Sequence, residues 1–263
     1  MHLNLAGRHA LVCGASGGIG RASAVELAAL GASVTVLARS ADTLQTVAES
    51  LPRHHEEQHH DWRSVDMAGT AALAGTVEQL VATRPVHILI NNTGGPPGGS
   101  AHAADRAAYE MAFRQHVLAG QTLLQAVLPG MRAEGYGRLV NVISTSVKEP
   151  IAGLGVSNTI RAAVAGWAKT LAGELAADGI TVNNVLPGYT RTARLDSLLA
   201  AKAQASGRTV DEVARGLVDS VPAKRFGEAA EVAAMIAFLC TPAAAYVNGT
   251  SIAVDGGRTR ALS

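Results

Sequence analysis

Residues 9–40 read HALVCGASGGIGRASAVELAALGASVTVLARS and decide the fold of this chain. An apolar run over residues 9–13 is followed by a glycine-rich turn, an alanine-rich segment of helical period and a second apolar run over residues 33–38. Two parallel strands need a crossover of this kind, because the chain must return along the sheet before the second strand begins. The stretch therefore predicts the first β-α-β unit of a parallel sheet.

The same alternation continues along the chain. We predict further strands at residues 86–91, 138–143, 180–186 and 251–254, and a weaker one at 62–66. The segments of helical period lie at residues 19–30, 41–51, 68–83, 105–134, 158–177 and 229–241. This order is typical of an α/β fold with a doubly wound parallel sheet and helices on both faces.

One segment lies outside the alternation. Residues 193–220 are amphipathic and stand between a strand and a helix. We expect a single domain over residues 1–263, with this segment as a substrate lid.

Composition excludes several classes of partner. Hydrophobic residues make up 48% of the chain, charged residues 16%, and the net charge is +1, which gives no electrostatic reason to expect nucleic acid or an anionic membrane as partner. No apolar stretch is long enough to cross a membrane and no basic leader begins the chain, so we expect a soluble cytoplasmic protein. The two cysteines, Cys13 and Cys240, lie far apart in apolar surroundings and are expected to be buried thiols.

The glycine-rich turn predicts nucleotide binding. Such a turn alone is most often just a turn, but here a strand precedes it and a helix follows it. Its glycines allow a tight turn and a close approach of a pyrophosphate to the helix N-terminus. The expected contact residues are Gly14, Ser16, Gly17, Gly18, Ile19 and Gly20.

The end of the second strand indicates which cofactor binds. An acidic residue there would accept hydrogen bonds from the ribose and repel a 2′-phosphate, whereas this sequence has Arg39 and no carboxylate. A guanidinium favours the 2′-phosphate of NADP(H). The alternative is a solvated surface arginine.

Four separated motifs then match a known family. They are residues 14–20, 91–94 (NNTG), 187–188 (PG) with Thr192, and 254–257 (VDGG). In their order and spacing the chain resembles the short-chain dehydrogenases/reductases, and among them the 3-oxoacyl-carrier-protein reductases. The resemblance implies a Rossmann-like fold, a small-molecule substrate and a homotetramer or homodimer. Apolar helices around Trp167 and residues 233–239 are compatible with such an assembly, and a buried helix face explains them equally well.

The resemblance also implies further cofactor contacts. Asp66 and Met67 would lie beside the adenine, Asn91 and Gly94 beside the adenosine ribose, and Pro187, Gly188 and Thr192 around the nicotinamide. Without it, the asparagine pair would be a strand-end turn and the Pro-Gly pair a loop breaker.

The catalytic pattern of that family is broken in this chain. The family uses a serine, a tyrosine thirteen residues later, a lysine four residues beyond, and an asparagine on the preceding helix. Ser144 matches the serine, whereas Ser157, Arg161 and His116 occupy the other three positions. Ser157 and Arg161 are one helical turn apart, so the geometry of the site can survive while its proton chemistry changes.

Two chemical solutions remain open. His116, if it faces the cleft, titrates near neutrality and could protonate an alkoxide during carbonyl reduction. Alternatively, a hydride adds to an unsaturated carbonyl compound, and Ser144, Asn158 and Arg161 stabilise the enolate until solvent protonates it. The competing interpretations are a packed helix histidine at position 116 and a helix N-cap at Asn158.

Other candidates are weaker. His54, His55, His59 and His60 have no second cluster to complete a metal site, so we expect no metal and a solvated surface. Tyr189 could replace the missing phenol or only form a wall of the substrate pocket, and Lys148 is expected at the surface.

The sequence therefore supports two hypotheses. The first is an NADP(H)-dependent oxidoreductase that reduces a small carbonyl or conjugated carbonyl compound, with an atypical active site. The second is a non-catalytic NADP(H)-binding sensor or interaction subunit.

Overall fold

The computed structural model describes residues 1–262 and contains one parallel sheet. Its seven strands follow the order β3-β2-β1-β4-β5-β6-β7, which confirms the doubly wound α/β prediction. The strands are β1 (His9–Cys13), β2 (Ser33–Ala38), β3 (His60–Ser64), β4 (Ile88–Asn91), β5 (Gly137–Val142), β6 (Ile180–Pro187) and β7 (Ser251–Val254).

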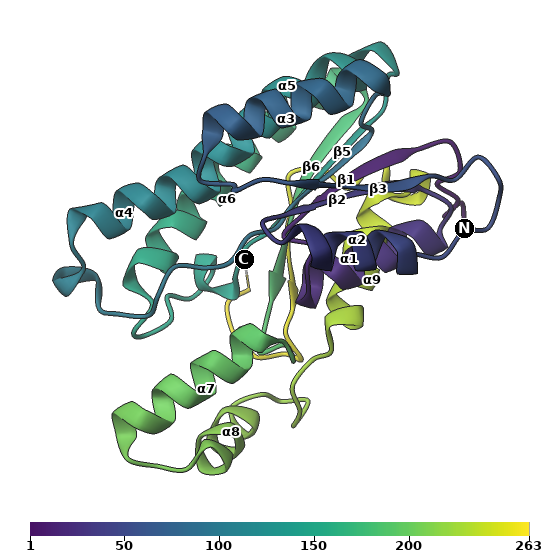
Figure 1. The fold of residues 1–263 in the computed structure, drawn as a ribbon. Helices are drawn as coiled ribbons and strands as arrows, with labels where there is room; N and C mark the ends of the chain where they lie inside the picture. Colours follow the sequence, from purple (N-terminus) through teal and green to yellow (C-terminus); the bar gives the residue numbers. More distant parts are fainter. Residues whose placement is uncertain (263) are drawn as a thin grey trace.

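Helices cover both faces of this sheet (Figure 1). One face carries α1 (Gly18–Ala29), α2 (Ala41–Ser50) and α9 (Ala229–Cys240). The other face carries α3 (Thr70–Thr83), α5 (Ala119–Ala133) and α6 (Gly155–Leu175). The central strands are buried on both sides, so their apolar runs are nearly continuous.

The strand order reverses between β1 and β4. From β1 the chain proceeds outward to β2 and β3, then returns to β4 on the other side of β1. In a doubly wound sheet the ligand crevice opens at this point, beyond the carboxyl ends of the strands. The glycine-rich turn, which follows β1, is therefore placed at the crevice.

Several predicted boundaries differ from the structure by one to three residues, and one predicted helix is divided. The helix expected over residues 105–134 consists of α4 (Arg106–Phe113), a π-helical segment η2 (Arg114–Leu118) and α5. Strand β3 begins at His60, two residues before the predicted start, and α6 begins at Gly155, three residues early. Short 3-10 helices are η1 (Ala101–Ala103), η3 (Thr145–Val147), η4 (Ala176–Asp178) and η5 (Pro242–Ala244).

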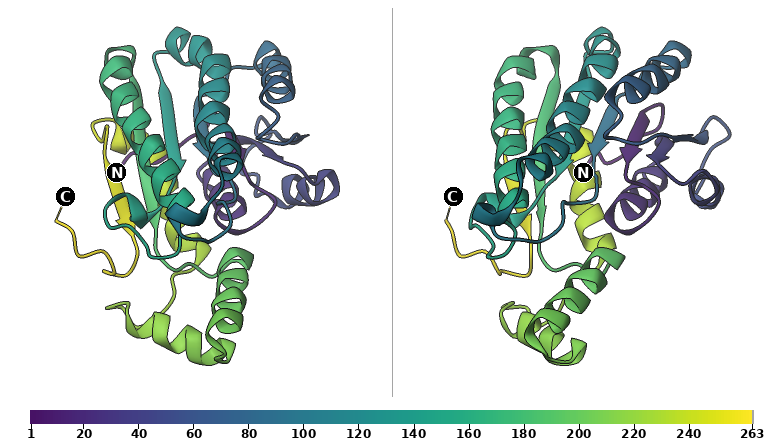
Figure 2. Two further views of the ribbon diagram at one scale, coloured as in Figure 1. Left: turned by 90° about the vertical axis from the view of Figure 1, so that its left-hand side faces the viewer. Right: turned by 60° about the vertical axis from the view of Figure 1, so that its left-hand side comes forward.

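The segment outside the alternation forms two helices, α7 (Ala193–Ser206) and α8 (Val210–Asp219). Figure 2 shows them beyond one end of the sheet, apart from both helical layers. They have a small core of their own, centred on Leu195, Leu199 and Val213. Thr209 and Glu212 form a reciprocal capping box that fixes the start of α8.

Two sequence expectations can be compared directly with this fold. Cys13 and Cys240 are both free and buried, as predicted. Burial raises the pKa of each thiol to about 12, so both stay protonated at neutral pH. No helix among residues 1–262 is long and apolar enough to span a bilayer.

Candidate active site

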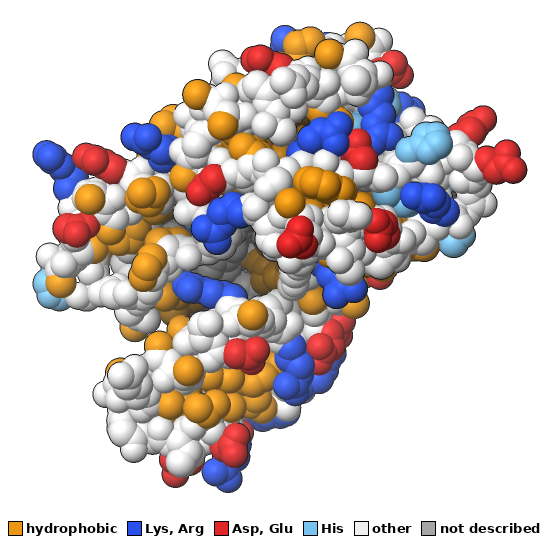
Figure 3. Space-filling view, in the orientation of Figure 1, with side chains coloured by type: hydrophobic (Ala, Val, Ile, Leu, Met, Phe, Trp, Pro, Cys, Tyr) orange, Lys and Arg blue, Asp and Glu red, His pale blue; other side chains and the backbone are white. Residues whose placement is uncertain are grey.

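A cleft of about 690 Å³ opens at the carboxyl ends of the strands. Its walls come from the glycine-rich turn, from the segments after β2 to β6, and from the N-terminal parts of α6 and α7. Figure 3 shows the corresponding hollow between α7 and the rest of the molecule. Residues far apart in the sequence, from Gly14 to Arg258, therefore share one cavity.

The glycine-rich turn has the close packing that a dinucleotide requires. Gly14 has a φ of +60°, and a Cβ there would also strike the main chain of Asn92. A Cβ on Gly20 would collide with the carbonyl oxygen of Gly14, so Gly20 allows the helix to pack against the turn and does not itself line the cleft. The remaining predicted residues of the turn do line it: Gly14, Ser16, Gly17, Gly18 and Ile19.

The adenosine end of the cleft fits a phosphorylated ribose. Arg39 and Ser40 line the wall after β2, and both are exposed. Arg39 forms no ion pair within the described chain, so its guanidinium is available to an anion. Asp66 and Met67 line the same cleft, and their position beside the adenine stays a prediction.

The two adjacent asparagines at the end of β4 do not both face the cleft, and the one that does differs from our expectation. Gly94 lines the cleft, but Asn91 does not. The amide of Asn91 points along the sheet and donates to Asn141 at 2.9 Å, Asn141 donates to Asn184 at 3.0 Å, and Asn184 donates to Ser251 at 3.0 Å. The predicted contact of Asn91 with a ribose is thus not supported, and Asn92 stands in the cleft wall instead.

Ser144 and Ser157 both line the cleft, together with Arg161. Ser144 ends the segment after β5, and its Oγ accepts a hydrogen bond of 3.1 Å from the Ser146 amide. Its own hydroxyl proton is therefore free to be donated into the cleft. Ser157, which is 9% exposed, lies on the first turns of α6.

Arg161 is fixed and remains a cation. It is 8% exposed, and its guanidinium donates to the carbonyl oxygens of Val142 at 2.9 Å and Thr93 at 3.4 Å. Burial, together with the charge of Arg194, lowers the pKa of Arg161 to about 10. The group is therefore protonated at neutral pH and offers its unused N–H donors, not a labile proton.

His116 cannot serve as predicted in this structure. It is 6% exposed, lies within η2 and does not line the cleft. Burial, and secondarily the charge of Arg161, lower its pKa to about 3, so the expectation of titration near neutrality was wrong. Gln115 faces the cleft instead, and donates to the Thr93 hydroxyl at 2.9 Å.

Asn158 also has a different role from either interpretation. It lies inside α6, whose N-cap is Leu154, so it is not the cap. Its amide donates to the Ile151 carbonyl at 2.9 Å and accepts from the Ile151 amide at 3.4 Å. It therefore braces the loop before α6, and it is absent from the cleft lining.

Pro187, Gly188 and Thr192 line the other side of the cleft, where the resemblance places the nicotinamide. Tyr189 lines it too, with its ring packed edge-to-face against Phe226 at 6.2 Å. Both the phenol and the wall interpretations of Tyr189 remain open in this geometry.

Sequence reasoning missed several residues of the cleft. Arg194 follows Thr192 on α7, and Arg258 follows the VDGG motif, so their proximity to recognised motifs was the available signal. Thr145, next to Ser144, was missed in the same way. Asn92 lies within the NNTG motif and Gln115 directly precedes His116, but the sequence does not show which of two adjacent polar side chains faces the cleft.

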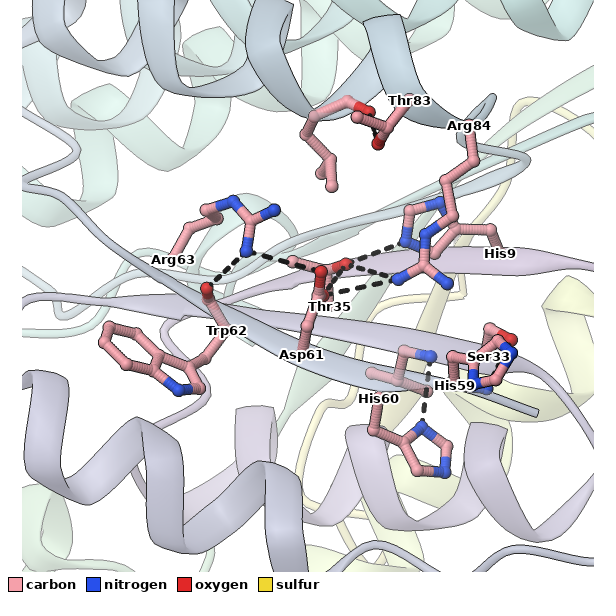
Figure 4. Close-up of polar contacts among 12 residues, drawn as sticks. His9, Ser33, Thr35, His59, His60, Asp61, Trp62, Arg63, Thr83 and Arg84 are labelled. Atoms are coloured by element: carbon pink, nitrogen blue, oxygen red, sulfur yellow. Dashed lines mark hydrogen bonds and ion pairs between the residues drawn. The ribbon is translucent and has the colours of Figure 1, made fainter. Parts of the chain in front are cut away.

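A second polar cluster lies away from the cleft, on β1, β2 and β3 (Figure 4). Thr35 donates to Asp61, which also accepts from Arg84 at 3.3 Å. In the same region both ring nitrogens of His60 are used, since Nδ1 accepts from the Val34 amide at 3.2 Å and Nε2 donates to the Pro52 carbonyl at 3.0 Å. Among residues 1–262 no three His, Cys, Asp or Glu side chains are placed to hold a metal ion.

Comparisons with known proteins agree with this geometry. A family model described as Enoyl-(Acyl carrier protein) reductase matches residues 14–259. The NADPH-dependent reductase BacG of Bacillus subtilis (strain 168) is 29% identical over 259 residues, which cover 97% of this chain and 99% of BacG. The 3-oxoacyl-[acyl-carrier-protein] reductase FabG of Pseudomonas aeruginosa is 31% identical over 259 residues, which cover 97% of this chain and 98% of FabG. The crystal structure of L-sorbose reductase from Gluconobacter frateurii, complexed with NADPH and L-sorbose, has a TM-score of 0.92 at 30% identity and covers 100% of both chains.

Proposed function

Because this chain belongs to the short-chain dehydrogenase/reductase family, we propose that it is an NADP(H)-dependent oxidoreductase that reduces a small carbonyl or conjugated carbonyl compound. One observation carries the proposal: a single cleft joins the nucleotide-binding turn to Ser144, Ser157 and Arg161. The similar proteins are reductases, which favours an enzyme over the non-catalytic sensor.

The chain's own residues fit NADP(H). The glycine-rich turn would receive the pyrophosphate, Arg39 the 2′-phosphate, and Gly94 and Thr192 the two ends of the nucleotide. Arg161 would hold the nicotinamide ribose with the donors that Val142 and Thr93 leave free. When bound, the cofactor would supply the hydride for the reduction.

Ser144 would bind the oxygen that becomes negative during the reaction. Its Oγ already accepts from the Ser146 amide, so its proton is free for a partner in the cleft. Arg161 adds a fixed positive charge in a buried position, where charge stabilisation is stronger than in water. Together they stabilise an alkoxide or an enolate without supplying a strong acid.

The proton source separates the two reactions. Carbonyl reduction requires a proton on the alkoxide, and the described cleft lining offers one phenol, that of Tyr189. Conjugate reduction ends in an enolate that solvent can protonate after the hydride has been added. Ser157 is too weak an acid for either step.

The first experiment measures NADPH binding and then NADPH oxidation with a panel of ketones and enones. We expect binding, and turnover of at least one class, with turnover lowered about 100-fold or more by Ser144→Ala if it acts as an oxyanion donor. Tight NADPH binding with no turnover of any compound would favour the non-catalytic alternative.

Three further features are part of the proposal. Helices α7 and α8 form the substrate lid, because α7 contributes Arg194 and Leu195 to the cleft.

The protein is cytoplasmic and assembles as a homotetramer or homodimer. Exposed Met111 and Phe113 on α4 support assembly, whereas residues 233–239 of α9 are largely covered by this chain's own α1. Light scattering after size-exclusion chromatography tests the assembly.

A further inference from the structure

The substrate end of the cleft is cationic. Arg161, Arg194 and Arg258 all line it, whereas the one carboxylate of the described lining, Asp66, follows β3 at the adenosine end. None of the three arginines forms an ion pair with a described carboxylate. Figure 3 shows lysine or arginine side chains at the rim of the hollow.

Arg161 and Arg194 approach the same point from different helices. The Nη2 atoms of Arg161 and Arg194 lie 3.6 and 3.7 Å from the position that a Cβ on Gly95 would take. Arg194 is also held there by a 2.8 Å hydrogen bond to the Pro96 carbonyl. Two guanidinium groups so close together repel each other, and an anion between or beside them would remove that cost.

Arg258 brings a third cation close to the reacting group. Its guanidinium lies 4.7 Å from the centre of the Tyr189 ring, and its Nη1 donates to the Thr145 hydroxyl at 3.3 Å. Thr145 follows Ser144 directly, so this guanidinium is next to the proposed oxyanion donor. The ring and the hydroxyl orient Arg258 while most of its N–H donors remain free.

We propose that the substrate carries a carboxylate close to the carbonyl group that is reduced, and that Arg258 binds this carboxylate with help from Arg194. A planar guanidinium binds a carboxylate through two parallel hydrogen bonds, which gives orientation as well as affinity. The proposal rests on the proposed reductase function and specifies the substrate class of the same site. An oxo acid or an unsaturated oxo acid has the required groups.

The cofactor is the other possible source of anionic groups. Its pyrophosphate and 2′-phosphate already have proposed places at the glycine-rich turn and at Arg39. Arg194 lies beside Gly95 and Pro96, next to Gly94, which is assigned to the cofactor, so a cofactor contact is the alternative role for Arg194. Measuring cofactor affinity separately from substrate affinity therefore distinguishes the two sources.

The experiment uses matched acids and esters with full-length protein and NADPH. Benzylidenepyruvate contains a ketone, a conjugated double bond and a carboxylate, and its methyl ester lacks only the charge. Acetoacetate and methyl acetoacetate form a second pair without the conjugated bond. For each acid that is a substrate, we expect a kcat/KM at least about 10-fold above that of its ester. This is the fold-change that one charge-assisted hydrogen bond contributes.

Arg258→Met should reduce that preference to near unity by raising the KM of the acid far more than that of the ester, with the NADPH dissociation constant unchanged. Arg258→Lys should retain part of the preference that Arg258→Met loses, because lysine keeps the positive charge but lacks the two parallel N–H donors of a guanidinium. The matched control is Arg260→Gln, since Arg260 is exposed, lies two residues away and does not line the cleft. Arg194→Met should weaken acid binding as well; if it weakens NADPH binding instead, Arg194 belongs to the cofactor and its part of the proposal is wrong.

A measurement of substrate binding tests the carboxylate proposal even where the reaction is too slow to follow. Calorimetric titration of the NADP⁺ complex with each acid and ester should show acid binding that Arg258→Met abolishes. If the wild-type protein turns over esters and acids with equal kcat/KM, the carboxylate proposal is wrong while the reductase function stands. Equal binding of esters and acids likewise contradicts the carboxylate proposal. If the acids bind but NADPH is never oxidised with any compound, the reductase function fails while the anion site stands.

Discussion

Replacing His116 by asparagine should make the fold less sensitive to mild acid. The native imidazole is buried and has a pKa of about 3, whereas a histidine in the unfolded chain has a pKa near 6.5. Below the unfolded value the unfolded state therefore binds a proton that the native state does not. Stability that is fully present above that pH is lost as the pH falls toward the native pKa.

The size of the effect follows from those two pKa values. Each pH unit in this window costs about 1.4 kcal/mol for one such group, so acidification from about pH 7 to about pH 5 removes about 2 kcal/mol through His116. His9 acts in the same direction, because burial lowers its pKa to about 4. The wild-type protein should thus lose about 4 kcal/mol through the two histidines, and His116→Asn about half of that.

Denaturant unfolding at both pH values measures this difference. The comparison uses the change with pH rather than the absolute stability, so any loss from repacking at position 116 cancels. His102→Asn serves as control, because it removes an imidazole that is exposed in η1. An identical loss of unfolding free energy in wild type and His116→Asn would refute a buried neutral histidine.

Three further predictions concern the cleft. Arg39→Asp should lower NADPH affinity far more than NADH affinity, because it places a like charge beside the 2′-phosphate; equal losses in titrations with the two cofactors would contradict the assignment. Ser157→Tyr combined with Arg161→Lys supplies the family's phenol and lysine and should raise reduction of simple ketones; a folded, NADPH-binding double variant with no gain, alongside a parent that reduces enones, favours conjugate reduction. Tyr189→Phe should lower ketone reduction about 100-fold if its phenol donates the proton, and should leave enone reduction within a few fold; steady-state rates with matched ketones and enones decide between them.

The sheet could be predicted because its strands carry a strong local signal. β1, β2 and β6 are rich in β-branched and apolar residues and are almost entirely buried; Gly14 follows β1 and Gly188 follows β6. β3 has the sequence HDWRS and is only half-buried at the sheet edge, so its hydrophobic signal is weak and its position was predicted two residues late. The glycines of the turn were also recognisable from the sequence, because a positive φ and a close approach of neighbouring main chain allow only glycine there.

The direction of individual side chains could not be predicted in the same way. Asn91 and His116 were selected by spacing, yet their neighbours Asn92 and Gln115 face the cleft. At a strand end, neighbouring side chains point to opposite sides, so an error of one residue reverses the assignment. At η2 the backbone departs from α-helical geometry, and its sequence RQHVL contains no residue that predicts a π-turn, so helical spacing misplaced His116.

That π-helical segment also constrains how the chain can change in length. A π-turn holds one residue more than an α-helical turn, so η2 takes up an extra residue without turning α4 relative to α5. Deleting one residue from η2 would restore regular pairing, keep the buried side of α5, with Leu123 and Val127, aligned with the sheet, and change the directions of Gln115 and His116. A single-residue deletion in η2 should therefore leave the protein folded but alter the cleft wall, whereas one within α5 would turn its apolar face by about 100°.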